Sequence, residues 1–516
     1  MNRIKVLWVD DEIEMLKPHF IFLEDRGYEV VPCNNGQDAL DLIKENIYEI
    51  ILLDENMPGL NGLETLQEIK ISNPLLPVIM ITKNEEEHIM ENAIGAKISD
   101  YLIKPVNPNQ ILLSLKKILN HKNLVDKKTI QNYQKEFGRL SMSLNSLETH
   151  QDWIDHFEKL IFWELELEKL EDSSMLGIFE SQKKEANALF SKFIEKNYSS
   201  WFKEDKGPLL SHELFKKMVF PKLKQYKPTL LLVIDNLRLD QWKTIRTEIL
   251  NYYRIVDEVN YYSILPTTTQ YSRNSIFAGM TPLDIQKQFP NWWKHDYEDG
   301  GKNLHEENLL KAQCDNLDFK RPISYHKITQ LNQSKQLIKN LQNHSHEGLT
   351  AIVYNFIDMI SHAKSEMEVI KELAPDNRAY RSLTQSWFKS SSLKKLIIKA
   401  AELDFQLLIT TDHGTINVDR PSSVISDKET SMNLRYKTGK SLTFNNDQVF
   451  DCKEPKSLNL PSISINSRFI FAKEDFYFIY KKNYNHFVNL FRNSYQHGGI
   501  SLEEMIIPFV VLSPRK

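Results

Sequence analysis

The segment IILLDENMPGLNG, residues 50–62, places an apolar run directly before an aspartate and a turn rich in Pro, Gly and Asn. Similar apolar runs recur through the first 105 residues, at 4–9, 30–33, 50–53, 78–82 and 101–103, and segments of helical length separate them. Such alternation of strands and helices is typical of a doubly wound parallel sheet. The sequence therefore predicts a flavodoxin-like α/β domain at 1–120, closed by a helix at 108–120.

Polar side chains stand at the ends of the predicted strands. Asp10 and Asp11 follow the first strand, and Asp54 ends the third. Thr82 ends the fourth strand and Lys104 follows the fifth. Functional groups in such sheets collect beyond the carboxyl ends of the strands. The three carboxylates make an all-oxygen site suited to Mg²⁺, which can neutralise a phosphoryl group arriving on Asp54, while the hydroxyl and the ammonium contact its oxygens.

Beyond residue 120 the sequence changes character. From 121 to 207 it is polar and helix-favouring, with apolar residues such as Trp153, Phe157 and Leu160 spaced three and four apart. This spacing predicts an all-helical connector. A spacer is its simplest role, and a dedicated binding module is the alternative.

A second, larger α/β domain is predicted at 208–516, after a break at Gly207 and Pro208. Its strands are expected within four apolar runs: LLLVID (230–235), TAIVYNFID (350–358), FQLLITTDHG (405–414) and MIIPFVVL (505–512). Continuous apolar runs are typical of strands covered by helices on both faces. The stretch 414–466 is rich in Ser, Asn, Asp, Lys and Thr, and we expect a long irregular insertion there that shapes a pocket.

The composition is that of a globular protein, since 41% of the 516 residues are hydrophobic and 26% are charged. No apolar run approaches the roughly 18 residues of a membrane helix and no signal-peptide pattern opens the sequence, so we expect a cytoplasmic protein without membrane insertion. Three widely spaced cysteines argue against a disulfide framework and a thiolate zinc site. The net charge of −4 and the lack of a helix-turn-helix pattern after the first domain argue against direct DNA binding.

Four separated clusters in the second domain carry carboxylate and imidazole groups near strand ends. They are Asp235, Asp358 with His362, Asp412 with His413, and His497. Asp358 and His362 are four residues apart, so one helical turn places both on the same side. Asp412 and His413 are adjacent and must lie on a loop to face the same ion. Carboxylates and imidazoles without thiolates suit Zn²⁺, with Mn²⁺ as the alternative.

The segment LPTTTQYSRNSIFAGMTP, residues 265–282, places a cluster of hydroxyls before a helix-like stretch. A hydroxyl at a helix N-terminus between two cations loses its proton readily and can attack a phosphoryl group. Thr267, Thr268 and Thr269 are the candidates. Three further side chains could contact phosphate oxygens: Arg273, Asn274 and Lys294. Trp292 and Trp293 could stack on a base, and the alternative is that they pack in the core.

The first 120 residues resemble the receiver domain of response regulators, through DENMPGLNGLETL at 54–66, ITKN at 81–84 and YLIKPV at 101–106. The resemblance implies that Asp54 is the phosphoacceptor. It also implies metal ligands in the acidic pocket (Asp10 and Asp11), residues that read the phosphoryl state (Thr82 and Lys104) and a switch aromatic (Tyr101).

Over residues 210–516 the candidate ligands follow one another as an acid, a threonine, a DxxxH motif, a DH pair and a histidine near the C-terminus. This order resembles the metal-dependent alkaline phosphatase superfamily. The segment HGGISLEEMIIP at 497–508 is nearer to the PglZ branch of that superfamily. The resemblance implies one metal held by Asp235, Thr269, Asp412 and His413, and a second held by Asp358, His362 and His497. In the phosphodiesterase branch the nucleophilic Thr follows a P-T-x stretch and precedes a Gly by ten residues, which selects Thr269.

The three segments in this order are similar to PorX-like response regulators. The resemblance implies a sensor histidine kinase as partner and outputs to a sigma factor and to the type IX secretion motor. We further expect that phosphorylation of Asp54 alters receiver packing and favours a homodimer. Our first hypothesis is an enzyme, a metal-dependent phosphodiesterase acting on short or cyclic oligonucleotides. The second is a phosphorylation-gated adaptor that binds its partners through the PglZ domain without catalysis.

Overall fold

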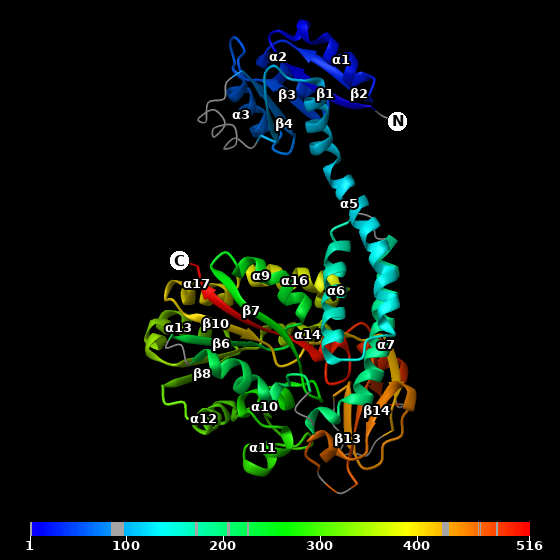
Figure 1. Cartoon of the computed structure of the whole chain (residues 1–516), viewed down its shortest axis with the longest axis vertical. Helices are drawn as coiled ribbons and strands as arrows, with labels where there is room; N and C mark the ends of the chain where they lie inside the picture. Colours follow the sequence, from blue (N-terminus) through cyan, green and yellow to red (C-terminus); the bar gives the residue numbers. More distant parts are fainter. Residues whose placement is uncertain are drawn as a thin grey trace. The chain divides into compact units, whose positions relative to one another are not determined.

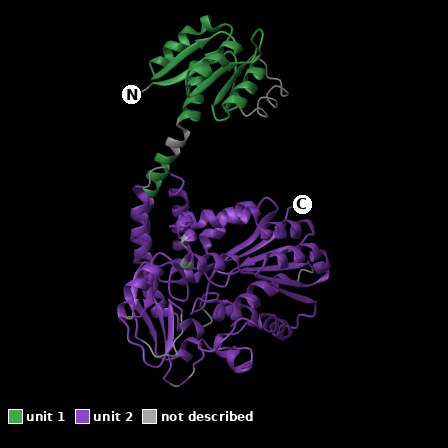
Figure 2. Ribbon diagram, turned by 180° about the vertical axis from the view of Figure 1, so that it is seen from behind, with its two compact units in different colours: residues 1–134 green, residues 135–516 purple. Residues whose placement is uncertain are grey.

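Figure 1 shows the computed structural model of the chain. The residues described are 3–83, 98–170, 174–203, 207–223, 227–425, 433–462, 464, 466–480 and 483–515, without the side chains of 120–125, 365, 366 and 368. The chain divides into two compact units, Met1–Gln134 and Lys135–Lys516, which Figure 2 colours separately. Each unit has its own sheet and core, so each is described by itself.

The first unit is built on a parallel five-stranded sheet of order β2-β1-β3-β4-β5. Its strands are β1 (Ile4–Val9), β2 (Tyr28–Cys33), β3 (Ile50–Asp54), β4 (Val78–Thr82) and β5 (Asp100–Ile103). Helices α1 (Lys17–Glu24), α2 (Gly36–Glu45) and α3 (Gly62–Ser72) connect them, and α5 (Pro108–Leu144) follows. Alternate residues of β1 enter two separate apolar clusters, as expected for a sheet with two covered faces. The predicted flavodoxin-like fold is confirmed.

Helix α5 is longer than the sequence indicated. The predicted end at residue 120 is wrong, because the helix continues unbroken for 37 residues to Leu144. No proline interrupts 109–144, and charged and amide side chains with good helix propensity dominate the exposed positions. The two compact units therefore meet within this helix, after Gln134.

The predicted connector is helical. After α5 it contains α6 (His150–Leu167) and α7 (Ser174–Asn197). Thr149 and Asp152 form a capping box that begins α6, since each side chain accepts a hydrogen bond from the other's backbone N–H. The apolar faces meet around Trp153, whose ring makes an edge contact with Phe190 of α7.

His156 of α6 makes the stability of the second unit sensitive to pH. Its side chain is buried, and its Nε2 has no hydrogen-bond partner in the part of the chain that the structure describes. Burial together with nearby Lys159 lowers its pKa from 6.5 to about 4. Because the folded pKa is depressed, stability is full above pH 6.5 and is lost as the pH falls toward 4. We expect His156 to cost about 2 kcal/mol of unfolding free energy between pH 7 and pH 5. Urea unfolding at both pH values should show this loss in the wild type and a smaller loss in His156→Gln, and equal losses would contradict the assignment.

The second unit is built on a six-stranded sheet of order β7-β18-β10-β6-β9-β8. The strands are β6 (Thr229–Ile234), β7 (Tyr253–Tyr262), β8 (Ile323–Ile328), β9 (Leu349–Tyr354), β10 (Gln406–Thr410) and β18 (Ile506–Pro514). The four strands from β10 to β8 are parallel, and β18 pairs antiparallel with both β10 and β7. Every residue of β6, β9 and β10 is buried, so both faces of the sheet are covered as predicted.

Helices lie on both sides of these strands, such as α9 above and α12 below in Figure 1. The helices of the second unit after α7 are α8 (Phe220–Leu223), α9 (Leu239–Ile249), α10 (Asn274–Ala278), α11 (Pro282–Gln288), α12 (Glu306–Asn316), α13 (Leu331–Asn340), α14 (Phe356–Glu366), α15 (Glu368–Leu373), α16 (Asn377–Ser390), α17 (Ser392–Glu402), α18 (Tyr484–Phe491) and α19 (Leu502–Met505). Two π-helical turns, Phe215–Val219 and Thr269–Arg273, precede α8 and α10. The parallel strands of the sheet place their carboxyl ends on one edge, where the predicted ligands follow.

The polar stretch 414–466 is not the irregular insertion we expected. It contributes β11 (Ile416–Asn417), β12 (Arg420–Ser423), β13 (Tyr436–Gly439) and β14 (Val449–Cys452), although 426–432, 463 and 465 lie outside the described residues. Their partners come from later in the chain: β15 (Arg468–Ala472), β16 (Phe476–Ile479) and β17 (Tyr495–Gln496). The prediction was wrong because these strands are only two to four residues long, too short for periodicity to reveal them.

Candidate functional site

The first unit gathers the predicted acids at the carboxyl ends of β1 and β3. Ligand atoms of Asp10, Asp11 and Asp54 lie within 4.8 Å of one another. Lys104 Nζ is 2.8 Å from both Asp10 Oδ2 and Asp54 Oδ1. Burial raises the pKa of Asp54 to about 6, although the hydrogen bond from Lys104 opposes this rise. Three carboxylates around a single ammonium leave a negative pocket that fits a hard divalent cation such as Mg²⁺.

The other two predicted receiver residues lie on neighbouring strands. Thr82 ends β4, and its hydroxyl donates to Glu55 Oε2. Tyr101 lies on β5 and is partly buried against the apolar cluster of the β1–β3 face. Sequence reasoning did not single out Glu55, because an acid directly after Asp54 carries no spacing signal that marks it as a partner for the threonine.

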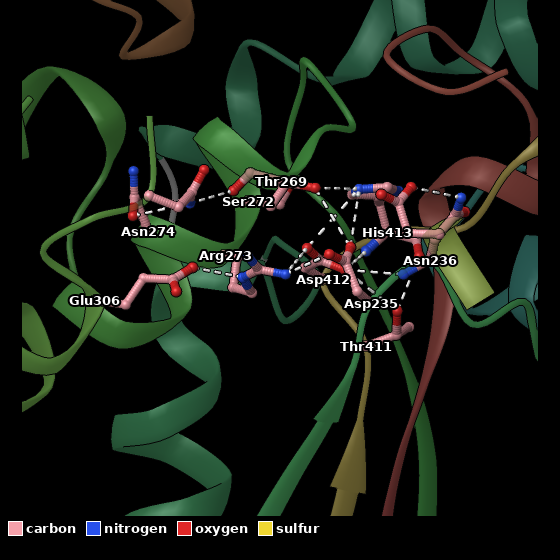
Figure 3. Close-up of polar contacts among 12 residues, drawn as sticks. Asp235, Asn236, Thr269, Ser272, Arg273, Asn274, Glu306, Thr411, Asp412 and His413 are labelled. Atoms are coloured by element: carbon pink, nitrogen blue, oxygen red, sulfur yellow. Dashed lines mark hydrogen bonds and ion pairs between the residues drawn. The ribbon is translucent and has the colours of Figure 1, made fainter. Parts of the chain in front are cut away.

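In the second unit, one predicted ligand set converges at the ends of β6 and β10 (Figure 3). Thr269 Oγ1 lies 3.3 Å from Asp235 Oδ1 and 3.2 Å from His413 Nε2. His413 Nε2 lies 3.8 Å from both Asp235 Oδ1 and Asp412 Oδ2. Asp412 and His413 follow β10 on a loop, as their adjacency required. The structure therefore brings together all four residues expected around one ion.

The second predicted set is formed by α14 and the loop after β17. Asp358 and His362 lie one turn apart on α14, with His362 Nε2 3.5 Å from Asp358 Oδ1. His497 Nε2 is 3.8 Å from the same carboxylate oxygen. One ligand atom of each residue lies within 4.8 Å of the others. These three residues could hold a second ion.

The two sets adjoin each other. The rings of His413 and His497 stack with centroids 4.2 Å apart. Asn236 also joins the sets, since its backbone N–H donates to Asp412 Oδ1 and its side-chain amide donates to Asp358 Oδ1. Asn236 adopts a left-handed backbone conformation with φ of 63°, which Asn tolerates better than most residues. Sequence reasoning missed Asn236, and its only signal was an Asn directly after the acid that ends a strand.

Hydrogen bonds orient both imidazoles toward the centre. His413 Nδ1 contacts the carbonyl oxygen of Gly414 at 3.0 Å, and His497 Nδ1 contacts that of Thr267 at 3.2 Å. A carbonyl only accepts, so Nδ1 of each ring carries the proton and Nε2 presents a lone pair. Burial lowers the pKa of both histidines, with His413 adding to the effect on His497, so the neutral form that binds a metal is favoured.

The two carboxylates of the first set, Asp235 and Asp412, have pKa values shifted in opposite directions. Burial and the neighbouring Asp235 raise the pKa of Asp412 well above its usual range. Burial would raise the pKa of Asp235 too, but its ion pair with Arg273 holds it below its ordinary value. Asp412 Oδ2 is buried and accepts no hydrogen bond from the described residues. Oxygen and neutral imidazole ligands around such a carboxylate fit Zn²⁺ or Mn²⁺.

Arg273 occupies a buried position beside the first set (Figure 3). Its guanidinium lies 2.5 Å from Asp235 Oδ2, 3.6 Å from Asp412 Oδ2 and 2.5 Å from Glu306 Oε1. Glu306 begins α12 and was missed, because nothing in the spacing connects it with residue 273. Arg273 therefore supplies a fixed positive charge at the centre rather than a free side chain.

The remaining candidates are engaged elsewhere. The Asn274 amide donates to the carbonyl of Lys302, and Lys294 Nζ donates to that of Asp299. Trp293 is buried against Tyr271, and Trp292 stacks on Phe289 and His305. In this structure the two tryptophans pack within the protein, which was the alternative to stacking on a base.

The three threonines have different surroundings. The Thr267 hydroxyl donates to the Gly499 carbonyl and accepts from the Gly498 N–H, so it already serves as both donor and acceptor. Thr268 Oγ1 is buried without a partner among the described residues. Thr269 is the one whose hydroxyl contacts predicted ligands, which makes it the best placed nucleophile of the three.

Three family models match this chain. Residues 6–116 match the response regulator receiver domain, residues 123–202 match the PorX response regulator linker domain, and residues 214–512 match the BREX system PglZ alkaline phosphatase-like domain. The last match alone covers more than half of the chain. The chain belongs to the PorX-like response regulators.

Individual relatives match this PorX-like chain over the receiver part. The transcriptional regulatory protein ZraR of Escherichia coli K12 is 32% identical over 142 residues, 28% of this chain and 32% of that protein. The CpxR homolog of Haemophilus influenzae is 41% identical over 118 residues, 22% of this chain and 50% of that protein. The chemotaxis protein CheY4 of Vibrio cholerae is 28% identical, with a TM-score of 0.22, over 22% of this chain and 98% of that structure. The chain thus spans about a third of ZraR and half of the CpxR homolog. Among the described residues, no helix is long and apolar enough to span a membrane.

Proposed function

We propose that the PglZ domain hydrolyses phosphodiesters at a centre of two divalent cations, and that phosphorylation of Asp54 controls it. The observation that carries this proposal is the position of the Thr269 hydroxyl. It contacts Asp235 and His413 at hydrogen-bond distance, beside the place where the two ligand sets adjoin. An alcohol is a weak nucleophile by itself and is activated by a neighbouring base or by metal coordination, and the groups around Thr269 offer both.

The chain's own residues would hold the two ions and supply the nucleophile. Asp235, Asp412 and His413 would hold one ion and Asp358, His362 and His497 the other, as Zn²⁺ or Mn²⁺. Bound there, the ions would polarise the phosphoryl group and lower the pKa of the threonine hydroxyl. The Thr269 hydroxyl would give its proton to solvent water while Oγ1 attacks phosphorus in line with the departing alcohol, which takes up a proton from water as it leaves. Water would then hydrolyse the phosphoryl ester on Thr269, which releases a phosphomonoester and restores the hydroxyl. Arg273 holds the Asp235 carboxylate in the ionised form that this chemistry needs.

The wider role follows from the receiver and from the family. We infer that the chain is cytoplasmic and that a sensor histidine kinase phosphorylates Asp54 in the presence of Mg²⁺ held by Asp10, Asp11 and Asp54. Family resemblance supports outputs to a sigma factor and to the type IX secretion motor. We further propose a homodimer on phosphorylation and short or cyclic oligonucleotides as substrates.

Arg273 favours one alternative. Its buried guanidinium already neutralises Asp235 and lies close to Asp412, so the pocket has a counter-charge of its own. A chain that used this pocket only for recognition would be a phosphorylation-gated adaptor without turnover.

The release of nitrophenol from bis-nitrophenyl phosphate separates the two functions. The purified full-length chain should hydrolyse this diester, lose at least about a hundredfold in rate after chelation, and recover with added Zn²⁺ or Mn²⁺. As a control, the chelator is removed by dialysis before the assay, so that direct inhibition of hydrolysis by the chelator is excluded. A protein that binds two metal ions per chain but hydrolyses no diester would refute the phosphodiesterase proposal and support the adaptor.

A further inference from the structure

The short helix α19 contacts both loops that carry the histidines of the centre. Its Glu504 accepts a hydrogen bond from the Gly414 N–H through its carbonyl, at 3.1 Å. The Glu504 carboxylate accepts another from the Gly499 N–H, at 2.9 Å. Gly414 follows His413 directly, and Gly499 lies two residues after His497. A displacement of α19 would therefore move both imidazoles.

Helix α19 approaches the loop after His413 unusually closely. A Cβ atom at Gly414 would lie 1.9 Å from the carbonyl oxygen of Glu503. Only glycine fits at that separation, so the backbone of α19 and the loop after His413 are in direct contact. The carbonyl of Gly414 is also the hydrogen-bond partner of His413 Nδ1. The orientation of that ring thus depends on where residues 502–504 lie.

Helix α7 of the linker holds α19 in place. Asn187 Oδ1 accepts from the Leu502 N–H at 2.8 Å, and Asn187 Nδ2 donates to Glu503 Oε2 at 3.1 Å. Lys183, one turn earlier on α7, lies 3.1 Å from Glu503 Oε1 and 2.9 Å from Glu164 Oε2 of α6. Asn187, Lys183 and Glu503 are 5%, 6% and 7% exposed. These contacts are therefore buried, where losing a partner is costly.

The linker also reaches the loop after β6. Glu164 Oε1 lies 2.8 Å from Arg381 Nη1, and Arg381 also pairs with Asp240. Asp240 pairs in turn with Arg238, three residues after Asp235. A buried ionic chain thus joins α6 to the segment that carries a third metal-ligand position.

We propose that Lys183 and Asn187 of the linker are positioning residues for the two-metal centre of the PglZ domain. They fix α19, and α19 fixes the loops of His413 and His497. Residues that orient metal ligands through hydrogen bonds typically contribute 10–100-fold to metal affinity. The linker then acts as a structural part of the centre and not only as a spacer. The expected change in diester hydrolysis rests on the proposed function, but the expected change in metal affinity does not.

Zinc affinity of the full-length chain, measured by competition with a chromogenic chelator, tests this inference. Asn187→Leu should weaken zinc binding by about 10–100-fold and lower kcat for the diester. Gln182→Leu is the matched control, because Gln182 lies on the same helix and donates to Phe137 and Ser141 of α5 instead. It should lower Tm without changing zinc affinity. Equal zinc affinity in the wild type and in Asn187→Leu would overturn the proposal.

If Asn187→Leu does not fold, two more conservative substitutions, at Asn187 and Glu503, still test the proposal. Asn187→Asp retains the acceptor for the Leu502 N–H but faces a carboxylate at Glu503, so zinc affinity should fall. Adding Glu503→Gln restores a donor and acceptor pair, so the double variant should recover most of the affinity. Failure of the recovery would overturn the positioning role. A wild type that binds zinc normally but hydrolyses no diester would refute the proposed function alone, whereas a wild type that binds neither Zn²⁺ nor Mn²⁺ would refute both.

Discussion

Thr269→Val should lower the turnover of bis-nitrophenyl phosphate by about 10³-fold or more, with zinc still bound. Valine has nearly the same shape but lacks Oγ1, the atom that contacts Asp235 and His413. The nucleophile is therefore removed, while little packing changes. The measurement is kcat in the metal-loaded full-length chain, together with zinc content.

Thr268→Val is the matched control for this substitution. Thr268 is the neighbouring residue, and its buried hydroxyl has no hydrogen-bond partner among the described residues, so its loss should leave kcat within about threefold of the wild type. If Thr269→Val kept its diesterase rate while Thr268→Val lost it, the nucleophile would be Thr268. If both kept the rate, a threonine mechanism would be excluded.

Asp54→Asn should abolish labelling of the chain by a small phosphodonor such as acetyl phosphate. An amide cannot form the acyl phosphate, and it removes one of the three carboxylates that would hold Mg²⁺. Lys104 would keep its contact with Asp10, so the receiver should remain folded. Phosphate incorporation, followed by mass spectrometry of the intact chain with and without Mg²⁺, measures the loss.

Asp41→Asn on α2 provides the control for Asp54→Asn. Asp41 is an exposed acid paired with Lys44 on the same helix, so its amide should leave phosphate incorporation unchanged. Labelling that persisted in Asp54→Asn at the wild-type level would move the phosphoacceptor to another acid. The same two variants, assayed for diester hydrolysis with phosphodonor present, show whether the receiver controls the PglZ domain.

The sequence predicted those features that depend on local patterns. The strands β1, β3 and β4 are largely apolar, and polar residues end or directly follow them, so both the sheet and the receiver acids were visible in advance. Asp358 and His362 were predictable as neighbours because helical geometry relates positions four residues apart. The grouping of ligands from distant loops came instead from family resemblance, since spacing alone does not relate Asp235 to Asp412.

The features that the sequence did not predict depend on long-range contacts. Glu306 meets Arg273 only because α12 folds back on the π-helical turn, and no periodicity connects them. The strands within 414–466 pair with later segments, so their short polar sequences resembled a loop. Asn187 lies on a helix whose pattern was clear, but its amide acts on residues 315 positions away.

The continuity of α5 affects how this protein can be dissected. A truncation at residue 120 would cut through the middle of a helix that runs from Pro108 to Leu144. Each piece would then expose about four unpaired amide or carbonyl groups at the break and would fray there. Phosphotransfer or hydrolysis measured on such halves would report on damaged ends, so a fragment for separate study should retain α5 whole.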